Sequence, residues 1–332
     1  MATGNHRSLN DYTVGWLCAL SEEMAAAEAM LDETHESLPL PESDDNSYTF
    51  GKVGGHCIVI ACLPAGEYGT TYATAAATHL ISTFGRSIRF GLMVGIGGGI
   101  PSENADIRLG DVVVSHPRFA YGGVVQYDYG KALHDGIFQS TGQLNGPPNN
   151  LLSALSKLQA THHRDNRQFM SYLRTIGRGS SQFAARMSRP ALEDRLYCAD
   201  YKHVEGRATC SECDIAKIVS REIRDTNEPH IHYGVIASGN KVVKDSQLRD
   251  KLGHKFNAYC LDMESAGLMN HFKCLVIRGI SDYSDSHKND RWQGYAAAAA
   301  AAFAKEFLLT VPVVQTRNTE PMTTGPTSLT IV

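Results

Sequence analysis

The sequence predicts an α/β fold in which helices cover both faces of a central, mostly parallel or mixed β-sheet. Strand-like runs alternate along the chain with helical stretches, several of which span ten or more residues. Many of the strand-like runs are apolar throughout, which is typical of strands buried on both faces. A chain of 332 residues that is 42% apolar can bury a full core. In such a fold, ligands are expected at the carboxyl ends of the strands.

Each element has its own local signal. Gly54 and Gly55 separate two strands and indicate a hairpin. Ser21 is a candidate N-cap for the first helix, and seven consecutive alanines at 296–302 favour close helix packing. The predicted strands are 12–20, 48–53, 56–63, 88–96, 111–115, 232–238, 258–263 and 274–280. The predicted helices are 22–32, 70–84, 246–252, 264–272 and 294–309.

The ends and one internal stretch depart from this alternation. We predict a flexible N-terminus at residues 1–10 and a single domain over residues 11–311. A flexible tail is predicted at residues 312–332, where Thr and Pro recur without a period. Residues 140–228 are polar and irregular, as expected for an insertion that decorates the domain and contributes little to its core.

Charge and composition narrow the class of partner. Charged residues make up 20% of the chain and the formal net charge is −4, which argues against nucleic acid or an anionic membrane as a partner. No apolar run reaches the length of a membrane span. The first residues lack a hydrophobic signal segment, so we expect a cytoplasmic protein. Eight cysteines are compatible with reduced thiols.

A glycine-rich stretch at residues 94–101 follows an apolar strand. Glycine lets a backbone turn sharply and approach a ligand closely, so Gly97 and Gly98 are candidate substrate-binding residues. A tight turn without a ligand is the alternative. Ile100 and Pro101 stop the helix that a dinucleotide fingerprint requires, and no Gly-Lys-Ser/Thr follows to make a P-loop. We expect no cofactor.

Three carboxylates lie at predicted strand ends. Asp262 and Glu264 flank Met263 at a strand-to-helix junction, and Asp282 follows the next strand. One carboxylate can accept hydrogen bonds from two vicinal sugar hydroxyls, and a methionine offers an apolar wall for a sugar or base. Two carboxylates in different environments favour one binding role and one proton-donating role. The alternative is that all three only cap helix amides.

The first strand ends in the same way. Glu22 and Glu23 follow it and open a helix. Acidic residues in a first helical turn commonly complement the helix dipole. A carboxylate that points into the site would instead be a candidate base for activating water.

One cysteine cluster has part of a metal-site pattern. Cys198, His203, Cys210 and Cys213 lie within sixteen residues, but their spacing matches no standard zinc finger. A structural metal at these residues and a redox-active or merely adjacent thiol pair both remain open. No metal-hydrolase signature is found among the histidines.

Several motifs together resemble the nucleoside phosphorylase/nucleosidase superfamily. They are "VGWLCALSEEM", "VGIGGGIP", "DIRLGDVVVS", "GVIASGN", "LDMESAGLM" and "VIRGISDYSD", in that family's order. "CLPAGEYGTT", "VVQYDYG" and "SDSHKNDRWQGYAA" are similar to fungal purine nucleosidase-like proteins and to fungal immune-receptor N-terminal domains. The resemblance implies a three-layer α/β/α sandwich, cleavage of the N-glycosidic bond of a ribonucleoside, and a homo-oligomer.

The resemblance also implies roles for the strand-end residues. Glu264 corresponds to the glutamate that holds the ribose 2′- and 3′-hydroxyls, and Met263 to the methionine packed under the ribose. Asp282 corresponds to the acid that protonates purine N7 as the bond breaks. Ser281 is then expected to orient that carboxylate.

The family positions that line the base are less closely matched. Val242 and Val243 correspond to the segment beside the base, where relatives commonly have an aromatic residue in place of Val242. Asp262 matches a second acidic position that is glutamate in many relatives, so its reach is shorter.

The same resemblance bears on whether the acceptor is water or phosphate. Phosphorolytic relatives have Arg-Val-Gly-Ser where this chain has Met93-Val94-Gly95-Ile96, so both the charge and the hydroxyl are missing. They also have an arginine in the first turn, where this chain has Glu22 and Glu23. Glu23 aligns with the water-activating glutamate of bacterial nucleosidases, so hydrolysis is favoured over phosphorolysis. Arg278 and Arg291 remain as possible phosphate ligands, although Arg278 belongs to a strand motif shared with hydrolases.

We therefore predict a purine nucleosidase that acts on adenosine or a similar nucleoside, with or without a 5′ modification. Uridine-specific relatives use a Gln/Arg pair for the pyrimidine, and no equivalent pair is found. The alternatives are a phosphate-dependent phosphorylase and a catalytically weak nucleoside-binding sensor module. Glu23, Glu264 and Asp282 together argue against the sensor, because binding alone requires neither an N7 acid nor a water-activating base.

Overall fold

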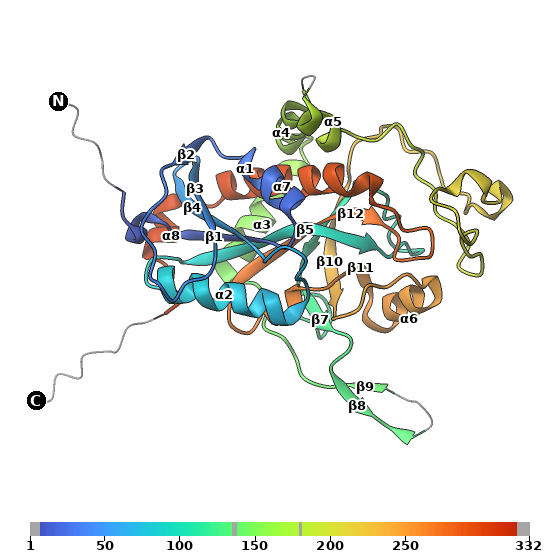
Figure 1. The fold of residues 1–332 in the computed structure, drawn as a ribbon, viewed down its shortest axis with the longest axis horizontal. Helices are drawn as coiled ribbons and strands as arrows, with labels where there is room; N and C mark the ends of the chain where they lie inside the picture. The colour runs from blue at the N-terminus through green and yellow to red at the C-terminus, as the bar shows by residue number, and fades with distance from the viewer. Residues whose placement is uncertain (1–6, 135–137, 179–180, 324–332) are drawn as a thin grey trace, which may run out of the picture.

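The computed structural model describes residues 7–134, 138–178 and 181–323, and its centre is one mixed sheet between two helical layers (Figure 1). The strand order is β11-β10-β6-β12-β5-β1-β4-β3-β2, with β7 beside β10. The strands are β1 (Val14–Cys18), β2 (Glu33–His35), β3 (Tyr48–Val53), β4 (His56–Cys62), β5 (Phe90–Gly99), β6 (Val112–Ser115), β7 (Val124–Gln126), β10 (Ile231–Ser238), β11 (Ala258–Asp262) and β12 (Cys274–Asp282).

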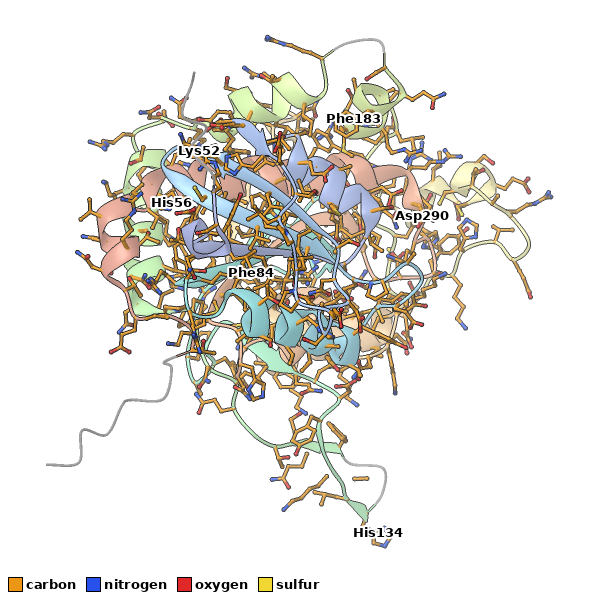
Figure 2. The ribbon with its side chains drawn as sticks, turned by 60° about the vertical axis from the view of Figure 1, so that its left-hand side comes forward. Lys52, His56, Phe84, His134, Phe183 and Asp290 are labelled. Atoms are coloured by element: carbon orange, nitrogen blue, oxygen red, sulfur yellow. The ribbon has the colours of Figure 1, made fainter. Side chains whose placement is uncertain are left out.

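Helices cover both faces of this sheet. On one face lie α1 (Ser21–Glu28) and α7 (Gln293–Thr310), and on the other lie α2 (Thr70–Phe84) and α6 (Ser246–Phe256) (Figure 1). Consecutive residues of β1 show the division, because Trp16 packs with α1 and α7 whereas Leu17 packs with α2. Phe84 is buried in the α2 layer (Figure 2). The predicted three-layer α/β/α class is confirmed.

The alanine run lies where α7 packs closely on β12 of the sheet. Residues 296–302 are all buried. A Cβ on Gly279 of β12 would overlap the backbone of Ala296, so glycine in the strand and alanine in the helix together permit this contact. The Gly54–Gly55 hairpin is also present, since β3 and β4 pair antiparallel up to Val53 and His56.

Two local predictions are wrong. Ser21 is the first residue of α1 and does not cap it; its hydroxyl donates to Glu22 (3.0 Å), while the Glu23 carboxylate accepts the Leu20 N–H (3.1 Å). The predicted helix at 264–272 is reduced to the 3₁₀ turn η5 (Ser265–Gly267), because this segment is pressed against α2, where the Thr74 hydroxyl donates to the Gly267 carbonyl (2.8 Å).

The polar segment 140–228 is only partly irregular. Its first half contains α3 (Asn149–His162), α4 (Phe169–Ile176) and α5 (Gln182–Met187), whose apolar side chains join the same core as α7. Each helix presents a buried apolar stripe within an otherwise polar stretch, which the bulk composition conceals. Before it, β8 (Gly130–Ala132) and β9 (Phe138–Ser140) form a hairpin that projects from the body, with His134 near its tip (Figures 1 and 2).

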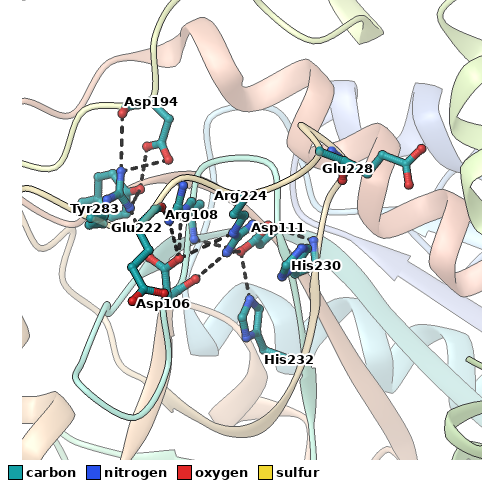
Figure 3. Close-up of polar contacts among 12 residues, drawn as sticks. Asp106, Arg108, Asp111, Asp194, Glu222, Arg224, Glu228, His230, His232 and Tyr283 are labelled. Carbon is teal, nitrogen blue, oxygen red and sulfur yellow. Dashed lines mark hydrogen bonds and ion pairs between the residues drawn. The ribbon is translucent and has the colours of Figure 1, made fainter. Parts of the chain in front are cut away.

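The second half, residues 188–228, contains only the 3₁₀ turns η3 (Cys210–Glu212) and η4 (Ile215–Lys217) as helical structure. Ion pairs hold it to the sheet (Figure 3). Arg224 donates two hydrogen bonds to Asp111 (2.7 and 2.8 Å). Tyr283 donates to Asp194 (2.6 Å) and accepts from Arg221 (2.9 Å). The segment is thereby fixed beside the residue that follows Asp282.

The two chain ends are more structured than their composition indicates. Residues 9–11 form the 3₁₀ turn η1 (Leu9–Asp11). In the predicted tail, α8 (Val313–Asn318) buries Thr316, and the Met322 N–H donates to the Ile88 carbonyl (3.0 Å). Residues 313–323 of the predicted tail therefore include a helix and contact the body of the domain. Residues 1–6 and 324–332 lie outside the described residues.

Candidate active site

Three strand ends meet at one edge of the sheet. Gly98 at the end of β5 pairs with Leu261 of β11 on one side and with Asp282 of β12 on the other. The glycine-rich stretch is therefore strand and not the tight turn considered from the sequence. A Cβ on Gly98 would overlap the Ser284 hydroxyl and lie 3.0 Å from Asp282 Oδ1, so the close approach requires glycine. A Cβ on Gly97 would lie 2.9 Å from the Leu261 carbonyl oxygen, so this position also favours glycine.

A buried ion cluster lies beneath this edge. Arg278 of β12 is fully buried, and its Nη2 lies 2.6 Å from Asp262 Oδ2 and 3.4 Å from Glu264 Oε2. Asp262 also accepts a hydrogen bond from the Ser265 hydroxyl. Burial opposes the charge of Arg278, but the ion pairs with Asp262 and Glu264 outweigh it and raise the pKa of Arg278. Asp262 is therefore engaged with Arg278 in this structure.

Glu264 lies between this cluster and the start of α2. Its Oε1 accepts the Gly69 N–H (3.2 Å). Burial raises the pKa of Glu264 to about 7. The positive charge of Arg278 lowers this pKa, whereas the neighbouring carboxylates of Asp262 and Glu23 raise it further. The side chain can thus exchange a proton near neutral pH.

Glu23 is buried near Arg278, and both side chains approach Gly95. Its Oε2 accepts the N–H groups of Ala19 (2.6 Å) and Leu20 (3.1 Å), and its Oε1 accepts the Ile96 N–H (2.8 Å). Burial raises the pKa of Glu23, while Arg278 and these three backbone donors oppose the shift. The carboxylate is held in one orientation between the first turn of α1 and the glycine-rich strand.

Asp282 ends β12 and is held by groups from its own loop. Its Oδ2 accepts from the Ser281 hydroxyl (2.8 Å), its Oδ1 accepts from the Ser284 N–H (2.9 Å), and Lys288 forms an ion pair with Oδ2. Asp282 lines a cavity of about 490 Å³ that Ser281 and Lys288 also border. It is thus the one of the three strand-end carboxylates that borders this open space.

The residues expected beside the base and sugar are spread around this edge. Met263 is partly buried between Asp262 and Glu264. Val243 is buried in a small cluster near α6, whereas Val242 is 48% exposed. Asn240, three residues before Val243, accepts hydrogen bonds from the Thr70 N–H (2.9 Å) and hydroxyl (2.8 Å) at the start of α2.

Of the four candidate metal ligands, the structure brings three together. The ligand atoms of His203, Cys210 and Cys213 lie within 4.8 Å of one another, and Cys198 is not part of this group. His203 and Cys210 line the same cavity as Asp282.

Two residues of the candidate site were not identified from the sequence. Lys288 pairs with Asp282 from a position six residues later, in a loop whose spacing gives no signal for this contact. Gly69 donates to Glu264 across 195 positions of sequence, so only the fold brings them together. Arg278 was considered as a phosphate ligand, and the structure shows it paired with carboxylates.

The chain belongs to the phosphorylase superfamily, whose family model matches residues 13–311. It is 46% identical over 308 residues to a nucleotide-binding leucine-rich repeat (NLR)-like protein of Hyaloscypha variabilis; the match covers 90% of this chain and 29% of that relative. It is 24% identical to the 5′-methylthioadenosine/S-adenosylhomocysteine nucleosidase of Mycobacterium bovis, covering 91% of this chain and 98% of the enzyme.

Solved structures confirm the fold. The Helicobacter pylori 5′-methylthioadenosine/S-adenosylhomocysteine nucleosidase superposes with a TM-score of 0.57 at 18% identity, covering 90% of this chain and 98% of that chain. The superfamily and the similarity to fungal receptor-like proteins, both inferred from motifs, are confirmed. None of the helices in the described part of the chain is long and apolar enough to cross a membrane.

Proposed function

We propose that this chain hydrolyses the N-glycosidic bond of an adenosine-like purine ribonucleoside to free base and ribose. Glu264 binds the ribose hydroxyls, Glu23 activates the attacking water, and Asp282 protonates N7 of the departing base. Departure of a purine leaves positive charge on the sugar and negative charge on the base. Carboxylates near the sugar stabilise the first charge, and an acid at N7 neutralises the second.

The charge of the buried cluster supports water as the acceptor. Glu23, Asp262 and Glu264 are arranged around one guanidinium, that of Arg278, which is already paired with Asp262 and Glu264. A phosphate ion beside Glu23 would add negative charge in a buried region where like charges repel strongly. This is the observation on which the proposal mainly rests.

Glu23 is suited to the role of base. Its raised pKa makes the carboxylate a better proton acceptor than an exposed glutamate, and its three backbone hydrogen bonds fix its direction. The Ile96 N–H that it accepts belongs to the glycine-rich strand, so its Oε1 lies against the strand that leads to Gly97 and Gly98.

Lys288 adds a condition to the proposed role of Asp282. Lys288 forms an ion pair with Asp282, whereas the proposed N7 acid must donate a proton to the base at the same carboxyl group. Lys288 is long, and its side chain is 22% exposed. The proposal therefore includes movement of Lys288 away from Asp282 when the purine enters.

A nucleoside-binding sensor module is the second candidate function. The observation that favours it is that the NLR-like relative is more than three times as long as the matched region. In such a protein this region could report nucleoside binding to other segments. Phosphorolysis is the third candidate and is disfavoured by the cluster charge. A homo-oligomer remains a prediction.

The deciding experiment is incubation of the purified protein with adenosine in phosphate-free buffer and again with added phosphate. The expected products are adenine and free ribose at the same rate in both buffers. Ribose 1-phosphate formed only with phosphate would instead establish phosphorolysis. Adenosine binding without any adenine release would favour the sensor. In Asp282→Asn, turnover should fall while adenosine binding persists, and unchanged turnover would remove Asp282 from the mechanism.

A further inference from the structure

A cluster of soft ligands lies beside the candidate active site. The imidazole of His203 and the thiols of Cys210 and Cys213 have their ligand atoms within 4.8 Å of one another. Cys213 is 5% exposed, and its N–H donates to the Cys210 carbonyl (3.3 Å), which closes the turn η3. Two thiols and an imidazole match the ligand preferences of Zn²⁺.

A fourth candidate ligand comes from a different part of the chain. His287 lies in the loop after Asp282 and is 8% exposed, and neither of its ring nitrogens has a hydrogen-bond partner among the described residues. Buried polar atoms normally have partners, so two such nitrogens require an explanation. The ring stacks on Tyr197 with centroids 4.0 Å apart, which holds it in place.

His287 lies outside the group whose ligand atoms are within 4.8 Å of one another, so metal binding requires its ring to move toward the other three ligands. The distance between the two imidazole rings is compatible with a shared ion. A zinc–nitrogen bond of about 2.0–2.1 Å puts each ring centroid about 3.2 Å from the ion, so two rings at a tetrahedral angle have centroids roughly 5.2 Å apart. The centroids of His203 and His287 are 5.4 Å apart, with the ring planes at 72°. Nδ1 of His287 also lies 3.7 Å from Asp285 Oδ1, which resembles the carboxylate that commonly orients a zinc-bound histidine.

We propose that His203, Cys210, Cys213 and His287 bind one Zn²⁺ ion. The ion joins the irregular segment 188–228 to the loop that carries Lys288, the partner of Asp282. The two parts are already in contact, because the His203 N–H donates to the Ser286 hydroxyl (2.9 Å). Since all four positions are occupied by protein groups, the site is structural and leaves no open position for catalysis.

The test is metal analysis of the full chain purified under reducing conditions without chelators, followed by chelation and titration with Zn²⁺ and Co²⁺. We expect one zinc per chain, and a Co²⁺ form with the visible bands of a tetrahedral site and thiolate charge-transfer bands. Absence of zinc together with no Co²⁺ spectrum on titration would overturn the proposal. A Cys210–Cys213 disulfide that blocks Co²⁺ until it is reduced, with no metal bound afterwards, would overturn it as well.

Matched variants locate the ligands independently of any nucleosidase activity. Cys213→Ser should lose the thiolate bands and lower zinc affinity by more than the ~10–100-fold typical of an outer-shell change. Cys198→Ser, the control within the same segment, should bind zinc like the wild type. His287→Ala should weaken zinc binding, and unchanged affinity in that variant would exclude the fourth ligand. Should Cys213→Ser fail to fold, the wild-type Co²⁺ spectrum still decides the question.

Discussion

Replacement of Glu23 by glutamine tests the proposed mechanism most directly. Glutamine has nearly the same shape but cannot accept a proton from water. General base catalysis typically contributes about 10²–10⁴ in rate, which corresponds to roughly 2.7–5.4 kcal/mol of activation free energy at 1.36 kcal/mol per tenfold change. We therefore expect kcat on adenosine to fall by about 10²–10⁴, while binding of adenosine changes little because Glu23 is proposed to contact water and not the ribose.

The structure also predicts what the substitution does to stability. The carbonyl oxygen of glutamine can still accept from Ala19 and Leu20, but its NH₂ group would face the Ile96 N–H, whose bond to Glu23 measures 2.8 Å. Losing a hydrogen bond to a charged group costs about 1.5–3 kcal/mol, and removing a buried charge offsets part of this cost. The protein should therefore stay folded with a lowered Tm.

The assay compares kcat, adenosine binding by calorimetry, and thermal unfolding for Glu23→Gln and for Glu22→Gln. Glu22 is the matched control, because it occupies the same helical turn but is only partly buried. We expect the control to resemble the wild type in all three measurements. A folded Glu23→Gln protein with wild-type kcat would refute Glu23 as the base, and equal losses in the two variants would indicate a general effect on the helix.

Further variants and a pH series test the other groups. Glu264→Gln should weaken adenosine binding about 10–150-fold, since it removes a charge-assisted hydrogen bond worth about 1.5–3 kcal/mol; calorimetry with wild-type affinity would contradict the ribose assignment. Because the pKa of Glu264 is raised to about 7, the native protein holds a proton there that the unfolded chain has released. The contribution of Glu264 to unfolding free energy should thus decline as pH rises from about 4.5 to about 7, while adenosine binding tightens from about pH 6 to about pH 8 as the carboxylate forms. Gly98→Ala should abolish turnover with little change in helix content by circular dichroism, because its Cβ would displace Ser284 and Asp282. Arg278→Met should lower the free energy of unfolding by about 3–5 kcal/mol in urea titrations, because it leaves Asp262 and Glu264 buried without their cation.

The location of the acidic site residues at strand ends could be predicted, because strand ends follow from the apolar pattern of the sequence. Asp282 ends a strand whose nine residues are all buried, and Asp262 ends another. The carboxyl ends of parallel strands converge on one edge of a sheet. In this sheet, however, β11 runs antiparallel to β5 whereas β12 runs parallel to it, so the meeting of Asp262 and Asp282 depends on strand pairings that the sequence does not give. Glu23 could be placed at a strand end in the same way. The direction of its side chain could not be predicted, because its partner Ile96 lies 73 positions away.

The features that were not predicted depend on contacts between distant segments, which no local sequence pattern indicates. Residues 264–272 have helical composition, but their packing against α2 leaves space for only one 3₁₀ turn. The glycine-rich stretch indicates a turn until its two strand partners are known. The helices of segment 149–187 were concealed by polar composition, although each has a buried apolar stripe.

Arg278 shows how burial decides between two chemical interpretations of one residue. By type it could bind phosphate, as arginines in phosphorolytic relatives do. Its side chain is fully buried in β12, however, and such a charge is tolerated only where nearby anions compensate for its lost hydration. Asp262 and Glu264 provide that compensation. A phosphate ion would have to displace these carboxylates and leave them unpaired beside Glu23, whereas a water molecule requires no such exchange. The same ion pairs that keep Arg278 in the core therefore favour water as the nucleophile at this edge of the sheet.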